Sequence, residues 1–281
     1  MDIPILFDFN DYDRLLPLVT NSLIAGALLA LIGGLVGVFV MTRELSFAVH
    51  GISELSFAGA AIFLLIGLDV VTGSIVGSLA AAAILAFLGD KAKDRNSIVA
   101  VLMPFGLGIG ILALSLYPGR SANKFGLLTG QIVAVDDPKL FWMAGIAAVV
   151  VVTMLVIWRP LTFASLDVEV AAARGINVKF LGIGFVMLLG LAVAAAVQIV
   201  GALLVLAILV TPAAAALRLS SSQIWVPVLS VSFAAISMLG GIFLALGAGL
   251  PISPYVTTIS FTIYLLARGL GSIRSRRRVS A

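Results

Sequence analysis

The stretch PLVTNSLIAGALLALIGGLVGVFVM (Pro17–Met41) decides the fold class, because it contains no charged residue along its whole length. A bilayer core about 30 Å thick is crossed by a helix of roughly 20 apolar residues, so this stretch predicts a transmembrane helix. The next apolar stretch, SFAVHGISELSFAGAAIFLLIG (Ser46–Gly67), is similarly long and carries His50 and Glu54. Two such stretches separated by a short turn indicate a protein that crosses the membrane repeatedly.

The composition of the whole chain supports this class. Of 281 residues, 62% are hydrophobic and 11% are charged, and the mean hydropathy is +1.22. Soluble domains carry about 25% charged residues, so we expect an all-α, polytopic membrane protein without a separate soluble domain. The sequence contains no cysteine and no GxxxxGK[ST] phosphate-binding loop, which excludes thiolate metal ligands and an ATPase of this type. We therefore expect a transport protein rather than an enzyme.

Hydropathy predicts about nine transmembrane helices, or eight if one segment is re-entrant. The expected spans are 17–41, 46–67, 70–88, 97–117, 139–158, 179–198, 199–217, 223–247 and 252–268. Residues 1–16 are acidic and lack the basic start of a signal peptide, so we interpret them as an extracytoplasmic segment. Residues 17–268 form the transmembrane domain, and residues 269–281 form a basic tail. Between spans, Phe125–Val135 is moderately apolar but too short to cross, and is expected to be a surface helix or a re-entrant element.

The distribution of Lys and Arg predicts the orientation in the plasma membrane. With the N-terminus outside, four of the 17 basic residues lie outside and the other 13 lie in cytoplasmic segments. The positive-inside rule favours this arrangement, with the C-terminus in the cytoplasm. The net charge of +4 is then a topological signal rather than a sign of nucleic-acid binding. We interpret the RSRRR run (Arg274–Arg278) as an anchor or a contact to anionic membrane lipid.

The pair His50 and Glu54 is the strongest candidate for a functional site. His50 is the only histidine in the chain, and residues four apart share one face of a helix. Ionisable groups inside a membrane usually mark a transport path, and Ser46 and Ser53 lie on the same arc of about 100° as candidate pathway-lining residues. Imidazole and carboxylate together suit Mn²⁺, Zn²⁺ or Fe²⁺. The same pair is also compatible with a proton relay, or with a hydrogen bond that only holds two helices together.

Residues 159–178 form a candidate docking segment on the cytoplasmic side. Ser165 or Asp167 is placed to cap a short helix that runs through Ala173, and Gly175 provides a stop signal. A short helix of mixed polarity between two spans indicates a docking element for another protein. An ordinary loop helix without a partner is the alternative.

Five segments, taken in order, resemble the metal-type (manganese, zinc or iron) permeases of ABC transporters. RELSFAVHGISELSFAGAAI (Arg43–Ile62) resembles R-x-x-S-F-x-x-D-x-x-S-H-x-x-x-x-G, and Asn96–Ile111 and Gly126–Val135 resemble the family segments that follow it. Ser165–Val178 is similar to F-D-x-E-x-A-x-x-x-G, and Val200–Ser220 is similar to V-G-x-L-L-V-x-A-L-L-x-x-P-A-A-x-A. The family's intramembrane Asp and His fall on His50 and Glu54, so this chain reverses their order and leaves the identity of the metal open.

The resemblance implies an ABC importer permease fold that works as a homodimer with separate cytoplasmic ATPase subunits. It also implies an extracytoplasmic metal-binding lipoprotein as the receptor. The docking residues would be Asp167, Glu169, Arg174 and Gly175. No permanently bound cofactor is implied, since the divalent metal is the transported substrate. The alternative function is a proton-coupled secondary transporter with His50 and Glu54 as its relay.

Overall fold

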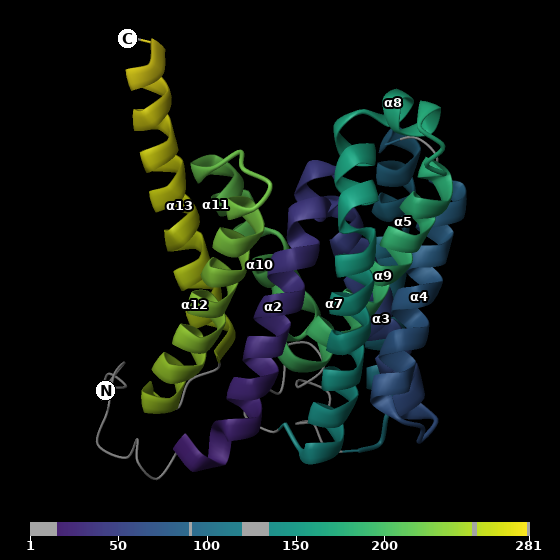
Figure 1. Cartoon of the computed structure of the whole chain (residues 1–281). Coiled ribbons are helices and arrows are strands. Elements are labelled where there is room, and N and C mark those ends of the chain that lie inside the picture. The colour runs from purple at the N-terminus through teal and green to yellow at the C-terminus, as the bar shows by residue number, and fades with distance from the viewer. Residues whose placement is uncertain (1–15, 90–91, 120–134, 249–251, 280–281) are drawn as a thin grey trace.

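The computed structural model describes residues 16–89, 92–119, 135–248 and 252–279, and in these ranges the chain forms helices and connecting turns without a strand (Figure 1). All residues before Leu16, and most of the Phe125–Val135 element, lie outside the described ranges. The elements in chain order are η1 (Leu16–Val19), α2 (Thr20–Thr42), α3 (Ser46–Leu65), α4 (Val70–Leu88), α5 (Ala92–Leu116), α7 (Asp137–Leu166), α8 (Val168–Ala173), α9 (Val178–Val200), η3 (Ala202–Leu204), α10 (Val205–Leu209), α11 (Thr211–Leu219), α12 (Trp225–Ala248) and α13 (Ile252–Val279).

Seven helices within the described ranges are long and apolar enough to cross a bilayer. They are η1 with α2, then α3, α4, α5, α7, α9 and α12, and each coincides with one predicted span. The chain is therefore a multi-pass, all-helical membrane protein. The predicted total of eight or nine spans is not confirmed, because α13 is long but more polar and the 199–217 region is interrupted.

The interruption at 199–217 corrects the prediction of one continuous helix there. α9 ends at Val200, and its C-cap Gly201 has a φ of 77° and a ψ of 162°, which belong to a region that is essentially restricted to glycine. The chain then forms the short pieces η3, α10 and α11, and a second break lies at Val210, just before Pro212. Pro212 lies in the first turn of α11, where the missing backbone N–H of proline is tolerated, so it is placed to start a new helix. The apolar composition of this region conceals both breaks.

Several polar side chains fix where the helices begin. Asp69 caps α4 by accepting from the backbone N–H of Thr72 at 2.8 Å, and Asp136 caps α7 by accepting from that of Lys139 at 3.2 Å. Asn177 does the same for α9. Such caps satisfy backbone donors that have no partner inside the helix, and each contributes about 1 kcal/mol. α7 continues through Pro160 to Leu166, beyond the predicted end at residue 158.

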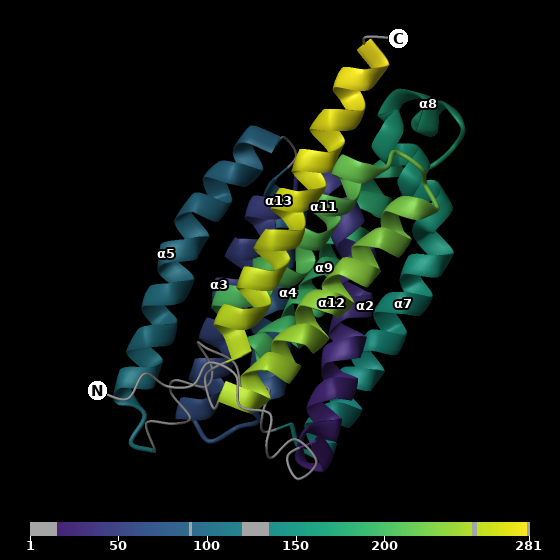
Figure 2. The same cartoon turned by 90° about the vertical axis from the view of Figure 1, so that its left-hand side faces the viewer.

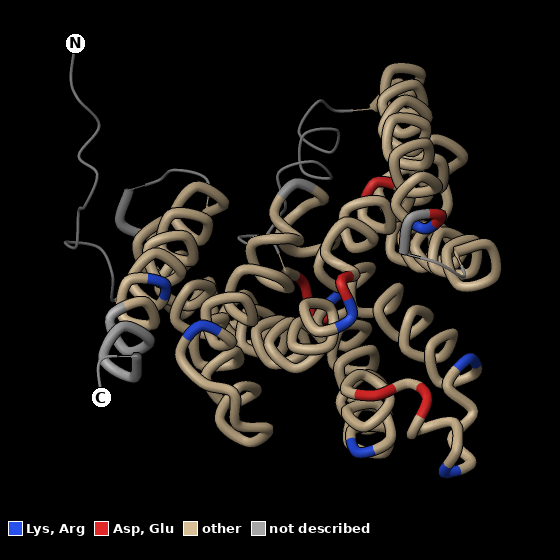
Figure 3. Tube along the Cα trace, turned by 90° about the horizontal axis from the view of Figure 1, so that it is seen from above, with Lys and Arg blue, Asp and Glu red and all other residues tan. Residues whose placement is uncertain are grey.

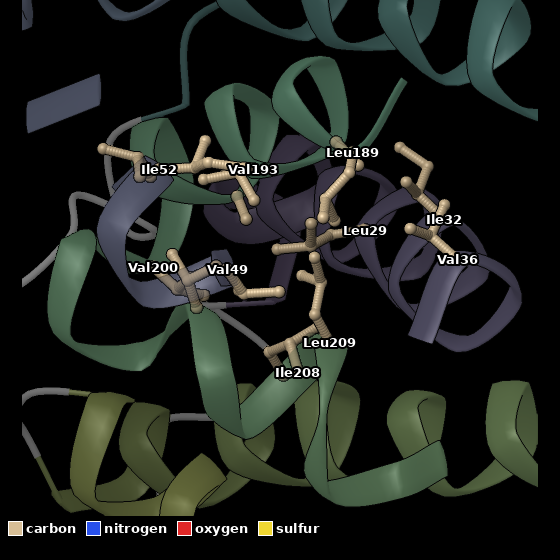
Figure 4. Packing of buried hydrophobic residues seen from close by; sticks show 14 of the residues in the cluster. Leu29, Ile32, Val36, Val49, Ile52, Leu189, Val193, Val200, Ile208 and Leu209 are labelled. Atoms are coloured by element: carbon tan, nitrogen blue, oxygen red, sulfur yellow. The ribbon is translucent and has the colours of Figure 1, made fainter. Parts of the chain in front are cut away.

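The main core lies where α2, α3, α9 and α10 meet. Figure 4 shows Val49 and Ile52 of α3 among side chains of α2, α9 and α10, and its labelled residues belong to one buried hydrophobic cluster. Because α3 is held on this side by α9 and α10, the opposite arc of α3 is left for His50 and Glu54.

α3 and α4 approach closely at glycine residues, which gives α3 a fixed position. A side chain on Gly59 would overlap the carbonyl oxygen of Gly73 and lie 3.0 Å from the Cα of Gly77. Small residues permit such approach of two backbones in membrane helices. Across the same interface, the hydroxyl groups of Ser56 and Ser74 lie 2.7 Å apart and are buried. The helix that carries the candidate pair is thus held firmly against its neighbours.

The two ends of the bundle differ in charge. α8, the end of α2, the start of α3 and the C-terminal end of α13 lie at the same end of the molecule (Figure 1). Figure 3, which looks down on that end, shows that most of the traced chain is uncharged. Lys139 is a described basic residue at the start of α7, which lies at the end of the bundle opposite to α8. Figure 2 shows α13 extending beyond the neighbouring helices, so residues 269–279 continue that helix.

Candidate functional site

His50 and Glu54 occupy successive turns of α3, as their spacing predicts. The His50 Nδ1 and Glu54 Oε1 atoms lie 3.9 Å apart, which is longer than a hydrogen bond. The Glu54 side chain is 4% exposed, whereas the His50 side chain is 27% exposed. The pair therefore joins a buried carboxylate to an imidazole that reaches the surface of a single chain.

Each member of the pair has a buried polar atom without a hydrogen-bond partner among the described residues. These atoms are Nδ1 of His50 and Oε2 of Glu54. Buried polar groups in folded proteins are normally satisfied, so an unsatisfied nitrogen next to an unsatisfied carboxylate oxygen requires an explanation. A hydrogen bond that only holds helices together does not account for this geometry, because in the described part of the chain neither side chain forms a hydrogen bond with the other or with another helix.

The two serine residues of the predicted pathway use their hydroxyl groups locally. Ser53 is fully buried and donates to the carbonyl oxygen of His50 at 2.8 Å. Ser46 is half-buried and lies 3.4 Å from the Sδ atom of Met41. Their role in lining a pathway stays a prediction.

α5 packs against α3 next to Glu54 through its own glycine residues. A Cβ atom on Gly106 would lie 3.0 Å from the carbonyl carbon of Glu54, and one on Gly110 would overlap the ring of Phe57. The structure shows that Gly106 places α5 directly against Glu54, which no local sequence signal identifies.

One chain supplies too few ligands for a complete metal site. Within the described ranges, no three His, Cys, Asp or Glu residues are grouped closely enough to hold an ion. His50 and Glu54 are chemically suited to a divalent transition metal, but they fill only part of a coordination shell. Water, backbone carbonyl groups or a second protein chain would have to supply the rest.

The predicted docking helix is present and is exposed. α8 (Val168–Ala173) begins with Asp167 as its cap, whose Oδ1 accepts from the N–H of Val170 at 3.0 Å. Ser165, the other predicted cap, belongs to α7 and donates to the carbonyl oxygen of Leu161. Gly175 follows with φ of +81°, a conformation that favours glycine. Asp167, Glu169, Arg174 and Gly175 are all exposed.

Known proteins resemble this chain over nearly its full length. The "Manganese transport system membrane protein MntC" of Listeria monocytogenes is 29% identical over 264 residues, which cover 92% of this chain and 94% of the relative. The "Manganese import system permease protein ScaB" of Streptococcus parasanguinis is 26% identical over 248 residues, or 88% of each chain. Among solved structures, "PsaBC from Streptococcus pneumoniae in complex with Fab" superposes with a TM-score of 0.81 at 27% identity, covering 92% of this chain and 93% of that chain.

The ABC 3 transport family matches residues 16–270, which include the His50–Glu54 pair, α8 and the interrupted 199–217 region. The resemblance to metal-type ABC transporter permeases is thereby confirmed. This chain belongs to the ABC 3 transport family as a multi-pass membrane permease.

Proposed function

We propose that this chain is the membrane subunit of an ATP-driven importer for manganese or another divalent transition metal, zinc or iron, with His50 and Glu54 contacting the ion during passage. The observation that carries the proposal is that Oε2 of Glu54 and Nδ1 of His50 are buried in a membrane helix and have no hydrogen-bond partner among the described residues. The manganese transport names of the MntC and ScaB relatives support it.

The partial exposure of His50 supports a homodimer. A polar side chain at membrane depth is not left against lipid, and faces protein or water instead. His50 is 27% exposed in the single chain, so another surface is expected to cover it. A second copy related by a twofold axis would bring two imidazoles and two carboxylates together, which is enough to hold an ion transiently.

The remaining partners follow from the family and from the arrangement of the helices. Cytoplasmic ATPase subunits would dock on α8, and an extracytoplasmic metal-binding lipoprotein would deliver the ion. With this orientation, which stays a proposal, the N-terminus would lie outside and the C-terminus in the cytoplasm at the plasma membrane. The end with α8 carries the larger share of the described Lys and Arg residues, as the positive-inside rule requires of the cytoplasmic side.

Manganese uptake by cells that depend on this transporter tests the role of the pair. His50→Ala and Glu54→Ala are each expected to reduce uptake at least tenfold at unchanged membrane expression. Ser232→Ala is a matched control, because Ser232 is an exposed residue of α12 that bonds only within its own helix. Uptake at the wild-type rate by both pair variants would refute the proposed role.

The double variant His50→Asp/Glu54→His restores the order of the family pattern. If the ligand types matter more than their order, this variant is expected to recover a large part of the uptake that either single substitution loses. A double variant as inactive as Glu54→Ala would contradict a direct ligand role. Uptake driven by a pH gradient in liposomes without ATPase subunits would instead establish the proton-relay alternative.

A further inference from the structure

Two arginine residues form a second cluster of polar side chains, at the end of the bundle where α8 lies. Arg43 caps the C-terminus of α2, and Arg95 lies in the first turn of α5. The Nη2 atom of Arg95 donates to the carbonyl oxygen of Arg43 at 3.5 Å. Two cationic side chains that are 52 positions apart in the sequence are thus brought together by the fold.

Both arginine residues keep a buried donor without an acceptor. Nη1 of Arg43 and Nε of Arg95 are buried and have no hydrogen-bond partner among the described residues. Burial lowers the pKa of Arg43, and the nearby charge of Arg95 lowers it further. A buried charged donor without an acceptor is unfavourable, and a like charge beside it adds repulsion. The arrangement is therefore suited to receiving an anion.

The surrounding groups satisfy the two guanidinium groups only in part. The guanidinium carbon of Arg43 lies 5.9 Å from the centre of the Phe185 ring, within range of a cation–π contact. Arg95 has a favourable electrostatic interaction with the carboxylate of Glu44. The Glu44 side chain is exposed. Glu44 has a φ of 56°, an uncommon conformation for a residue other than glycine. Among the described residues, one carboxylate beside two guanidinium groups leaves a net positive charge.

The surface next to Arg95 is apolar and exposed. Phe87 and Leu88, in the last turn of α4, are 67% and 64% exposed. They immediately precede Gly89, where a Cβ atom would lie 3.1 Å from the Cβ of Arg95. In a membrane protein such a surface contacts lipid chains, so the arginine pair lies at the boundary between chains and headgroups. A carboxylate from a partner protein, by contrast, would have to reach the arginine pair next to a surface that faces lipid.

We propose that Arg43 and Arg95 bind the phosphate group of an anionic membrane lipid, whose acyl chains cover Phe87 and Leu88. The planar guanidinium group matches phosphate oxygens with two parallel hydrogen bonds, and basic pockets between membrane helices are known to hold lipid headgroups. The bound phosphate would relieve the repulsion between the two cations. This site does not depend on which ion the protein transports.

Lipid binding to the purified, full-length transporter complex tests the proposal. Phosphatidylglycerol and phosphatidylcholine are titrated separately, and bound lipid is counted by native mass spectrometry. The wild type is expected to retain phosphatidylglycerol in preference, and Arg95→Gln to weaken its binding about fivefold, the ratio that corresponds to ~1 kcal/mol for one basic residue. Arg95→Lys keeps the charge and is expected to lose less. Arg218→Gln, an exposed arginine at the end of α11, is the control and is expected to bind as the wild type does.

A variant with the opposite expected effect keeps the test decisive if Arg95→Gln fails to fold. Glu44→Gln removes the carboxylate that competes with phosphate, so it is expected to bind phosphatidylglycerol more tightly than the wild type. Unchanged lipid binding in both Arg95→Lys and Glu44→Gln would overturn the proposal. Equal stabilisation by inorganic phosphate alone would also overturn it, in favour of a free-anion site. Loss of the ATPase subunit from Arg95→Gln with unchanged lipid binding would assign the pair to a protein carboxylate instead.

Discussion

Replacing Gly77 by alanine tests whether α3 and α4 are in backbone contact. A Cβ atom on Gly77 would overlap the carbonyl oxygen of Leu55 and lie 3.0 Å from its carbonyl carbon. These are main-chain atoms, which cannot rotate away as a side chain can. Restoring an ordinary contact of about 3.5 Å requires α3 and α4 to separate by on the order of 1 Å.

The expected loss of stability follows from two opposing effects. Overpacking of a close contact costs about 1–3 kcal/mol, and we expect the upper part of this range because backbone atoms are involved. Alanine is the better helix former by about 1 kcal/mol, which offsets part of the loss. The net destabilisation is therefore about 1–2 kcal/mol, which corresponds to a decrease in Tm of roughly 2–6 °C.

Thermal unfolding of the purified protein in detergent measures this difference. Gly108→Ala is the matched control, because a Cβ atom on Gly108 in α5 meets no heavy atom within 4 Å and should leave the Tm unchanged or slightly raised. Because α3 carries His50 and Glu54, Gly77→Ala is also expected to slow metal uptake. Equal Tm values for Gly77→Ala and Gly108→Ala would refute the close approach of α3 and α4.

Two helix caps provide further predictions. Asp167→Ala removes the cap of α8 and is expected to destabilise that helix by about 1 kcal/mol. The amount of ATPase subunit that co-purifies with the permease should therefore decrease. It should recover in Asp167→Asn, because asparagine keeps an accepting oxygen. The pKa of Asp69 is subject to two opposing effects. Burial raises it, but hydrogen bonds from the Thr72 side chain and from the backbone N–H groups of Thr72 and Val71 lower it. The charge of Lys139 lowers it further, and the pKa lies below its usual value. A carboxyl with a lowered pKa stabilises the folded state above its unfolded pKa and loses that contribution as the pH falls through the folded value. The Tm of the wild type should therefore fall more steeply below about pH 4 than that of Asp69→Asn, and parallel decreases would contradict the lowered pKa.

Much of the fold follows from hydropathy, and its departures have local physical causes. Hydropathy predicts the start of α4 to the residue, and the structure shows that Asp69 caps the helix there. α7 continues through Pro160, where the missing N–H removes one hydrogen bond of the helix. Hydropathy alone does not reveal whether a helix continues past such a proline. Conversely, Gly201 looks in the sequence like a simple turn between two spans. Its positive φ instead begins a region of short helices.

The candidate site was predictable only where it depends on spacing within one helix. His50 and Glu54 face the same side because they are four positions apart, and α3 keeps them there. The contact of Gly106 with Glu54, and the pairing of Arg43 with Arg95, join segments about 50 positions apart. Tertiary packing creates these contacts, and no local periodicity encodes them.

ATP-dependent manganese accumulation in liposomes, with the permease and its ATPase subunits reconstituted together, tests the central claim most directly. The comparison is between the wild type and Glu54→Gln, which keeps the shape of the side chain and removes its charge. If Glu54 contacts the ion, Glu54→Gln is expected to lose at least nine-tenths of the accumulation while the ATPase subunits remain bound and hydrolyse ATP. Accumulation by Glu54→Gln at the wild-type rate would contradict the role of the His50–Glu54 pair in metal passage.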